Sequence, residues 1–121
     1  MFEDRFIQTF NAGDTVFSQG SKGSHMYVVL SGSVELQRTT DDGGSNVMAS
    51  MGPGEIFGEM AIVDSGVRMA SAVAGSPETR LVVIDQARFV YLTSQQPVFA
   101  LSVMRVMAQR IHALRQTIDA N

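Results

Sequence analysis

The stretch Phe-Gly-Glu-Met-Ala-Ile-Val-Asp-Ser-Gly-Val-Arg-Met-Ala-Ser, residues 57–71, is the most informative part of this chain. Gly58 lacks a Cβ, so a ligand can approach the backbone closely there. Residues 59–63 contain no helix breaker and predict a short helix, whose first N–H groups lack internal partners and attract anions. Arg68 follows a predicted turn at Asp64–Gly66 and is placed to grip the same anion through two parallel hydrogen bonds.

Glu59 puts a carboxylate beside this predicted anion site. A carboxylate is a good double acceptor for sugar hydroxyls, so Glu59 is expected to bind hydroxyls rather than the anion itself. The combination indicates a nucleotide or a sugar phosphate. The alternative is that Glu59 and Arg68 form an ion pair that braces a turn, and exposed pairs of that kind contribute little.

Short segments with alternating or β-branched apolar residues lie between glycines along the first three quarters of the chain. They are Thr15–Phe17, Met26–Leu30, Ser33–Gln37, Val47–Ser50, Met69–Val73 and Arg80–Ile84. Strands at this spacing, separated by turn signals, predict a sandwich, a jelly roll or a barrel. Asp42-Gly43-Gly44 predicts a hairpin turn, because these residues tolerate positive φ.

The last part of the chain is predicted to be helical over residues 97–119. Pro97 suits a first turn, and no glycine or proline follows it. Its apolar residues form two rows, Leu101, Met104, Ala108, Ile111 and Ile118, and Val103, Met107 and Leu114. Two rows need two surfaces, of which one could be the roll and the other a partner helix or a ligand; one wide core-facing stripe is the alternative. A shorter helix is expected at Asp85–Ser94, with Phe89, Val90 and Leu92 inward.

The stretch at residues 57–71 resembles the phosphate-binding cassette of cyclic nucleotide-binding domains, of the catabolite activator and protein kinase A regulatory subunit type. The matching residues are Phe57, Gly58, Glu59, Met60, Ala61, Arg68, Ala70 and Ser71. Upstream segments resemble the family in order and spacing, and the resemblance covers residues 6–116. It implies a mainly β fold with flanking helices, an eight-stranded β-roll or double-stranded jelly roll with a C-terminal helix. One domain is expected over 1–121, with a roll at 1–90, a cassette at 57–73 and the helix at 97–119.

The resemblance also implies a role for each cassette residue. Glu59 is expected to accept the ribose 2′-hydroxyl, and Arg68 to neutralise the cyclic phosphate. The backbone N–H groups of Met60 and Ala61 are expected to donate to phosphate oxygens. Gly58 is expected to lie close to the ribose.

Two positions depart from the family pattern. Val67 stands where a proline usually precedes the arginine, which removes turn rigidity but no ligand contact. Met69 stands where a serine or threonine is associated with cyclic GMP, and it has no hydroxyl for the guanine amino group. This favours cAMP over cGMP, although Met69 would also fit a crowded, degenerate pocket. Val47 and Met48, with a residue of the terminal helix, are the expected apolar neighbours of adenine.

The composition excludes several other classes of protein. The chain has 121 residues, 45% of them hydrophobic, which suffices for one core. A net charge of −3 argues against nucleic-acid binding, and the absence of cysteine excludes disulfides and thiolate chemistry. A metal enzyme with a similar roll would need several inward histidines, and the roll region has only His25. No metal, cofactor or catalytic residue is therefore expected. With no signal-like or membrane-spanning run visible, a cytoplasmic protein is expected.

The expected function is ligand sensing, in which the nucleotide repositions the terminal helix and an effector protein responds. The helix-turn-helix of the catabolite activator relatives is missing from this sequence. Three interpretations stay open: a free-standing sensor, which Met1 favours, a fragment of a larger receptor, or a ligand-free dimerisation or scaffold module. A homodimer through the C-terminal helix fits both the free-standing sensor and the dimerisation or scaffold module.

Overall fold

A computed structural model describes residues 4–63 and 66–120, with side chains for residues 5–63 and 66–113. The chain divides into two compact units, Met1–Gln86 and Ala87–Asn121. Asp64 and Ser65 of the predicted turn lie outside the described residues, as do the side chains of Leu114 and Ile118 in the predicted helix rows.

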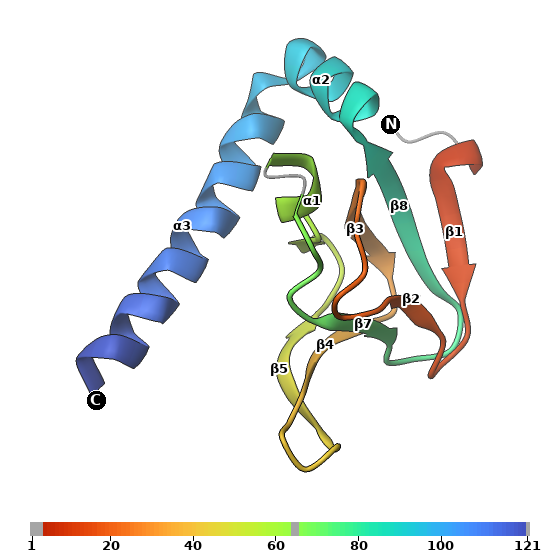
Figure 1. Ribbon diagram of the computed structural model, residues 1–121. Coiled ribbons are helices and arrows are strands. Elements are labelled where there is room, and N and C mark those ends of the chain that lie inside the picture. Colours follow the sequence, from red (N-terminus) through yellow and green to blue (C-terminus); the bar gives the residue numbers. More distant parts are fainter. Residues whose placement is uncertain (1–3, 64–65, 121) are drawn as a thin grey trace. The chain divides into compact units, whose positions relative to one another are not determined.

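In the first unit, the described residues form two antiparallel sheets of four strands each (Figure 1). One sheet has the order β1 Ile7–Phe10, β8 Thr79–Asp85, β3 His25–Ser31 and β6 Ile56–Phe57. The other has the order β2 Thr15–Phe17, β7 Ser71–Ala74, β4 Val34–Thr39 and β5 Ser45–Met51. A 3-10 turn, η1 Asp4–Phe6, precedes β1, and a short helix, α1 Met60–Val63, follows β6. The predicted β-roll is confirmed.

The core of the first unit comes from residues that alternate along the strands. A cluster of buried side chains consists of Tyr27, Val29, Val34, Phe57, Ala72 and Leu81. Residues two apart on a strand share one face, so Tyr27 and Val29 both face this core. The rings of Tyr27 and Phe57 stack with centroids 5.2 Å apart, and Phe17 is tilted at 5.8 Å from Tyr27. The Phe17 and Tyr27 rings also lie near the Arg68 guanidinium, whose central carbon is 3.9 Å and 5.9 Å from their centroids.

All six predicted strands are present, with β4 beginning one residue and β7 two residues later than predicted. β2 has the predicted bounds, whereas β7 begins at Ser71 rather than Met69. The reason lies in the backbone of Arg68, whose N–H donates to the Ser21 carbonyl at 2.7 Å. The chain therefore pairs with the preceding loop first and joins β4 only at Ser71.

The β4–β5 hairpin has the predicted turn. Gly43 has φ 86°, and the Thr40 N–H donates to the Gly44 carbonyl at 2.9 Å. The register of this pair shifts further along: Leu36 faces Ala49, whereas Gln37 faces Val47. Met48 is thus the extra residue of a β-bulge, a feature that redirects side chains locally.

The second unit begins within α2 Gln86–Gln95, after its first residue, and contains α3 Pro97–Ala120. The Phe89 and Phe99 rings meet with centroids 5.8 Å apart. Leu92 is buried as expected, but Val90 is exposed, so the expectation that it points inward is wrong: it lies on a different face of α2 from Leu92. None of the described helices is long and apolar enough to cross a membrane.

The two predicted rows of α3 differ in exposure. Leu101, Met104 and Ile111 of the first row are exposed, while Val103 of the second is buried. Whether the two rows meet two surfaces or form one wide core-facing stripe stays a prediction.

Candidate functional site

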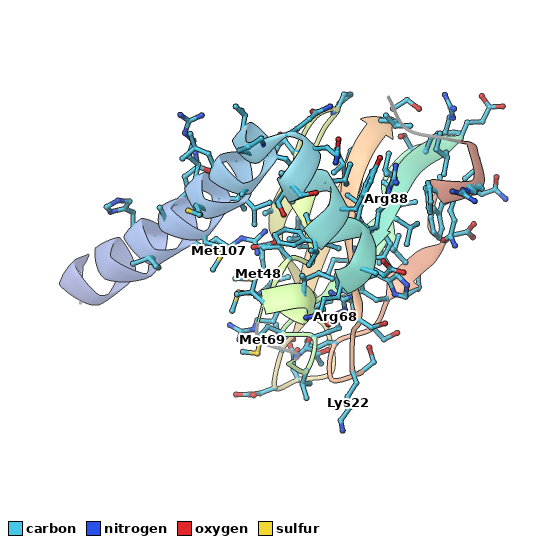
Figure 2. All side chains as sticks on the ribbon, turned by 90° about the horizontal axis from the view of Figure 1, so that it is seen from above. Lys22, Met48, Arg68, Met69, Arg88 and Met107 are labelled. Carbon is cyan, nitrogen blue, oxygen red and sulfur yellow. The ribbon has the colours of Figure 1, made fainter. Side chains whose placement is uncertain are left out.

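Arg68, labelled in Figure 2, carries a charge but is almost entirely buried, with 7% of its surface exposed. Its Nη1 donates to the Gly58 carbonyl at 3.0 Å, and its Nη2 donates to the His25 carbonyl at 2.7 Å. The guanidinium carbon lies 3.9 Å from the centroid of the Phe17 ring, a cation–π contact. A buried charge needs such partners, and here the backbone and an aromatic face supply them.

The backbone around Arg68 is bound to the loop after β2. Besides the Arg68–Ser21 bond, the Gly20 N–H donates to the Arg68 carbonyl at 2.8 Å. The Gln19 N–H donates to the Ser71 hydroxyl at 2.8 Å. These three hydrogen bonds fix the arginine's own Cα, so the side chain starts from a defined position.

The guanidinium keeps hydrogen-bonding capacity beyond its two carbonyl contacts. Arginine has five N–H donors in a planar fork, and the two carbonyl contacts use one on each terminal nitrogen. Its Nε is buried and has no hydrogen-bond partner among residues 4–63 and 66–120. An anion with two oxygens can be bound by donors of this kind through parallel hydrogen bonds.

Gly58 combines a left-handed backbone with a close approach to the arginine. Its φ is 75°, a region that residues with a Cβ rarely adopt. A Cβ at this position would lie 2.9 Å from Nη1 of Arg68 and 3.3 Å from Cδ1 of Tyr27. The structure therefore gives Gly58 a reason for being glycine, whereas its expected proximity to the ribose stays a prediction.

Glu59 is fully buried, with 0% of its surface exposed. Burial lowers the pKa of Arg68 below its ordinary value, and the acidic groups of Tyr27 and Glu59 oppose this change. The two charged cassette residues are thus electrostatically coupled within the first unit. Whether a ribose hydroxyl also binds to Glu59 stays a prediction.

The two residues after Glu59 begin α1, as the predicted short helix requires. Met60 is exposed and Ala61 is buried. The Ala61 N–H donates to the Gly58 carbonyl at 3.2 Å, so this carbonyl accepts from both Ala61 and Arg68. The predicted donation of the Met60 and Ala61 N–H groups to a phosphate stays a prediction, and for Ala61 it would require exchanging this long bond.

The predicted neighbours of the base are exposed apolar side chains. Val47 is 54% exposed, Met48 56% and Met69 65%. Val47 and Met48 are consecutive, so a regular strand would direct them to opposite faces, but Met48 is the bulged residue of β5. Figure 2 labels Met48 and Met69 together with Arg68. The structure thus leaves all three apolar side chains accessible.

Sequence reasoning missed the residues that surround the Arg68 side chain. Phe17, Gly23 and the His25 carbonyl all approach the guanidinium, and all precede it by more than forty positions in sequence. His25 takes part through its backbone, so no side-chain pattern could reveal it. Phe17 and Gly23 fall in a strand and a loop, where an aromatic residue and a glycine are common for other reasons.

Comparison with known proteins agrees with this geometry. The family described as "Cyclic nucleotide-binding domain" matches residues 7–96 of the chain. This chain belongs to the cyclic nucleotide-binding domain family. Members of this family are ligand-binding regulatory domains, and the recognised cassette falls within the matched residues.

Two curated relatives are similar to this cyclic nucleotide-binding domain over most of its length. The "Cyclic AMP receptor protein" of Thermus thermophilus is 36% identical over 107 residues, covering 88% of this chain and 49% of the relative. The "CRP-like cAMP-activated global transcriptional regulator" of Mycobacterium tuberculosis is 35% identical over 102 residues, covering 84% of this chain and 45% of the relative. The chain spans about half the length of these relatives.

A solved structure is similar to the domain in three dimensions. The catabolite activator protein of Thermus thermophilus matches with a TM-score of 0.85 and 34% identity, covering 93% of this chain and 53% of that protein. The similarity extends the family assignment from sequence to backbone.

Proposed function

We propose that this domain binds a 3′,5′-cyclic nucleotide without catalysing a reaction, and that Arg68 neutralises the phosphate. The observation that carries the proposal is the buried guanidinium with an unpartnered Nε–H among the described residues, lying inside the family's cassette. The names of two relatives, a cyclic AMP receptor and a cAMP-activated regulator, support this ligand class.

The remaining cassette residues complete the proposed site. Glu59 accepts the ribose 2′-hydroxyl, the Met60 and Ala61 N–H groups donate to the phosphate, and Gly58 lets the ribose approach the backbone. A buried carboxylate supports the first role, because a hydroxyl bound to it is shielded from competing water. No cofactor takes part in this proposal.

The proposed ligand is cAMP rather than cGMP. Met69, next to Arg68, offers an apolar side chain and no hydroxyl for the guanine amino group. Val47 and Met48 add apolar surface for adenine. The 65% exposure of Met69 supports an accessible site over the alternative, a ligand-free dimerisation or scaffold module with a degenerate pocket, because a side chain that crowded the pocket would be buried.

We further propose that residues 1–121 act as one sensor domain, with the roll at 1–90 and the helix at 97–119. Ligand binding repositions this helix, which then signals to an effector protein or forms a homodimer. Support comes from the exposed row of Leu101, Met104 and Ile111 on α3, which presents apolar surface to a partner. The relative named as a transcriptional regulator supports a cytoplasmic location.

Thermal unfolding of the purified chain tests the ligand. Binding to the folded state adds about 2.7 kcal/mol at a ligand concentration of one hundred times Kd. We expect cAMP to raise the melting temperature most, cGMP less, and 5′-AMP, whose phosphate is not cyclic, least. Equal shifts for all three, or none, would refute the proposal. Arg68→Ala serves as the control and is expected to lose the cAMP shift.

Oligomeric state and proteolysis test the signalling step. The proposal expects cAMP to change either the monomer–dimer equilibrium or the rate at which protease cleaves residues 97–119. Saturating cAMP that changes neither would leave a binding domain without the proposed helix response.

A further inference from the structure

The guanidinium of Arg68 lies in space that exists because residue 23 is glycine. A Cβ at Gly23 would lie 2.6 Å from Nη2 of Arg68 and closer still to its Nε and Cζ. Real Cβ atoms do not approach other heavy atoms so closely, so any larger residue would have to displace the arginine. This glycine belongs to the loop whose backbone holds Arg68.

The backbone at this position does not itself demand glycine. Several glycines of the chain have positive φ, and Gly23 is not among those described with it. Alanine can therefore adopt the native backbone here, and the cost of a Cβ falls on the arginine side chain. This separates Gly23 from Gly58, where φ is 75° and a substitution would also strain the backbone.

Phe17 contacts the same guanidinium through the face of its ring. The distance from Cζ of Arg68 to the ring centroid is 3.9 Å, within the range of a strong cation–π contact. Together with the carbonyls of Gly58 and His25, the ring fixes the plane of the guanidinium. A planar fork binds two oxygens in parallel only when its plane is set.

We infer that Gly23 and Phe17 are positioning residues for phosphate recognition: neither is assigned a ligand contact, and both fix where the guanidinium of Arg68 lies. The inference rests on the proposed function of Arg68. It means that the loop after β2 affects the affinity for the cyclic nucleotide through the side chain of Arg68.

The first test compares Gly23→Ala with Gly52→Ala by titration calorimetry with cAMP. Gly52 is the matched control, since its nearest atom to an added Cβ is 4.0 Å away and its φ is not positive. We expect Gly23→Ala to weaken cAMP binding about tenfold, because a displaced Arg68 would lose a charge-assisted hydrogen bond to the phosphate. Gly52→Ala should leave cAMP binding unchanged. Equal affinity for both variants would overturn the inference.

A double-mutant cycle distinguishes positioning from general damage. If Gly23 acts through Arg68, adding Gly23→Ala to Arg68→Ala should cost no further affinity. If the two losses add, Gly23 acts by another route and the inference fails.

A readout that needs no ligand keeps the inference separate from the proposed function. The Nε–H of Arg68 is buried, so its proton NMR signal should exchange slowly with water, and Arg68→Lys assigns the signal by its loss. We expect Gly23→Ala to shift this signal and to speed its exchange, with Gly52→Ala neutral. An unchanged signal overturns the inference even when cAMP binds. If the wild type binds no cyclic nucleotide, the proposed function fails and the NMR signal alone decides the positioning.

Phe17→Leu tests the contact between the Phe17 ring and Arg68, and Phe57→Leu, from the same aromatic cluster, is the variant for comparison. Both lose a ring, but the Phe57 ring stacks on Tyr27. Removal of a desolvated cation–π contact should weaken cAMP binding about three- to thirtyfold in Phe17→Leu. The effect of Phe57→Leu, measured on folded protein, should be smaller. The reverse order would rule out a role for Phe17.

Discussion

The two ends of the candidate site have opposite burial. At the charged end, Glu59 and Arg68 are buried, although charged residues are usually exposed. At the apolar end, Val47, Met48 and Met69 are exposed, although large apolar side chains are usually buried. Burial fixes the charged end, since every charge there must find partners, while the apolar end keeps surface that a flat base can cover. Substitutions should therefore have large effects at the charged end and small ones at the apolar end.

Arg68→Ala should have the largest effect. Loss of a charge-assisted contact with the phosphate should weaken cAMP binding by about ten- to a hundredfold. The variant also removes the guanidinium donors to the His25 and Gly58 carbonyls, of which the Gly58 carbonyl keeps the Ala61 N–H, at a cost of about 1–3 kcal/mol in the free energy of unfolding. Calorimetry and denaturant unfolding measure the two effects separately.

Arg68→Lys provides a second test of the same side chain in case Arg68→Ala does not fold. Lysine keeps the charge but lacks the planar fork, so affinity should fall between that of wild type and Arg68→Ala. If both variants bound cAMP as tightly as wild type, the charged end of the site would take no part in ligand binding.

Glu59→Gln should have the next largest effect. The amide keeps an acceptor oxygen but loses the charge, so cAMP affinity should fall about fivefold. The sharper measurement is the ratio of affinities for cAMP and 2′-deoxy-cAMP, which should shrink in the variant. Glu55→Gln, at an exposed glutamate, is the control. A ratio that stays the same in Glu59→Gln would mean that this carboxylate does not bind the 2′-hydroxyl.

Met69→Thr should change selectivity more than affinity. A hydroxyl beside Arg68 adds one neutral hydrogen bond for the guanine amino group, so cGMP affinity should rise about two- to fivefold. Competition between labelled cAMP and unlabelled cGMP measures the change. Val67→Thr places a hydroxyl at another exposed position nearby and should have no such effect. If both variants gained equally, Met69 would not contact the base.

Met48→Ala should have the smallest effect of the four. Its exposed side chain is one of three apolar neighbours proposed for the base, beside Val47 and Met69, so the others keep apolar surface and affinity should fall only about twofold. Asn46→Ala, on the same strand, is the control. A loss as large as that of Arg68→Ala would contradict the proposed division between a fixed and a tolerant end.

The sequence predicted what depends on local pattern. Glycine-bounded alternation placed β2 and the β4–β5 hairpin, and the breaker-free run after Glu59 placed α1. β1 and β6 were not located, because β6 has two residues and β1 is half polar, too little for an alternation signal. Val90 was assigned inward because apolar character alone does not say which face of a short helix is covered.

The cassette residues could be listed from sequence, but their surroundings could not. Gly23 and Phe17 meet Arg68 through space, across more than forty intervening residues, and the His25 contact uses a carbonyl that every residue has. The bulge at Met48 likewise depends on the register of two strands. Contacts of this kind are properties of the folded pairings, which a local pattern does not contain.

The hydrogen bonds between residues 19–21 and 68–71 hold the loop after β2 in a fixed position relative to Arg68. An inserted residue there would shift the arginine along with the loop, whereas the Thr40–Gly44 turn at the end of β4–β5 carries only its own hairpin. A fluorescent reporter joined to this domain should therefore be inserted at the Thr40–Gly44 turn, and the loop after β2 should be left unchanged.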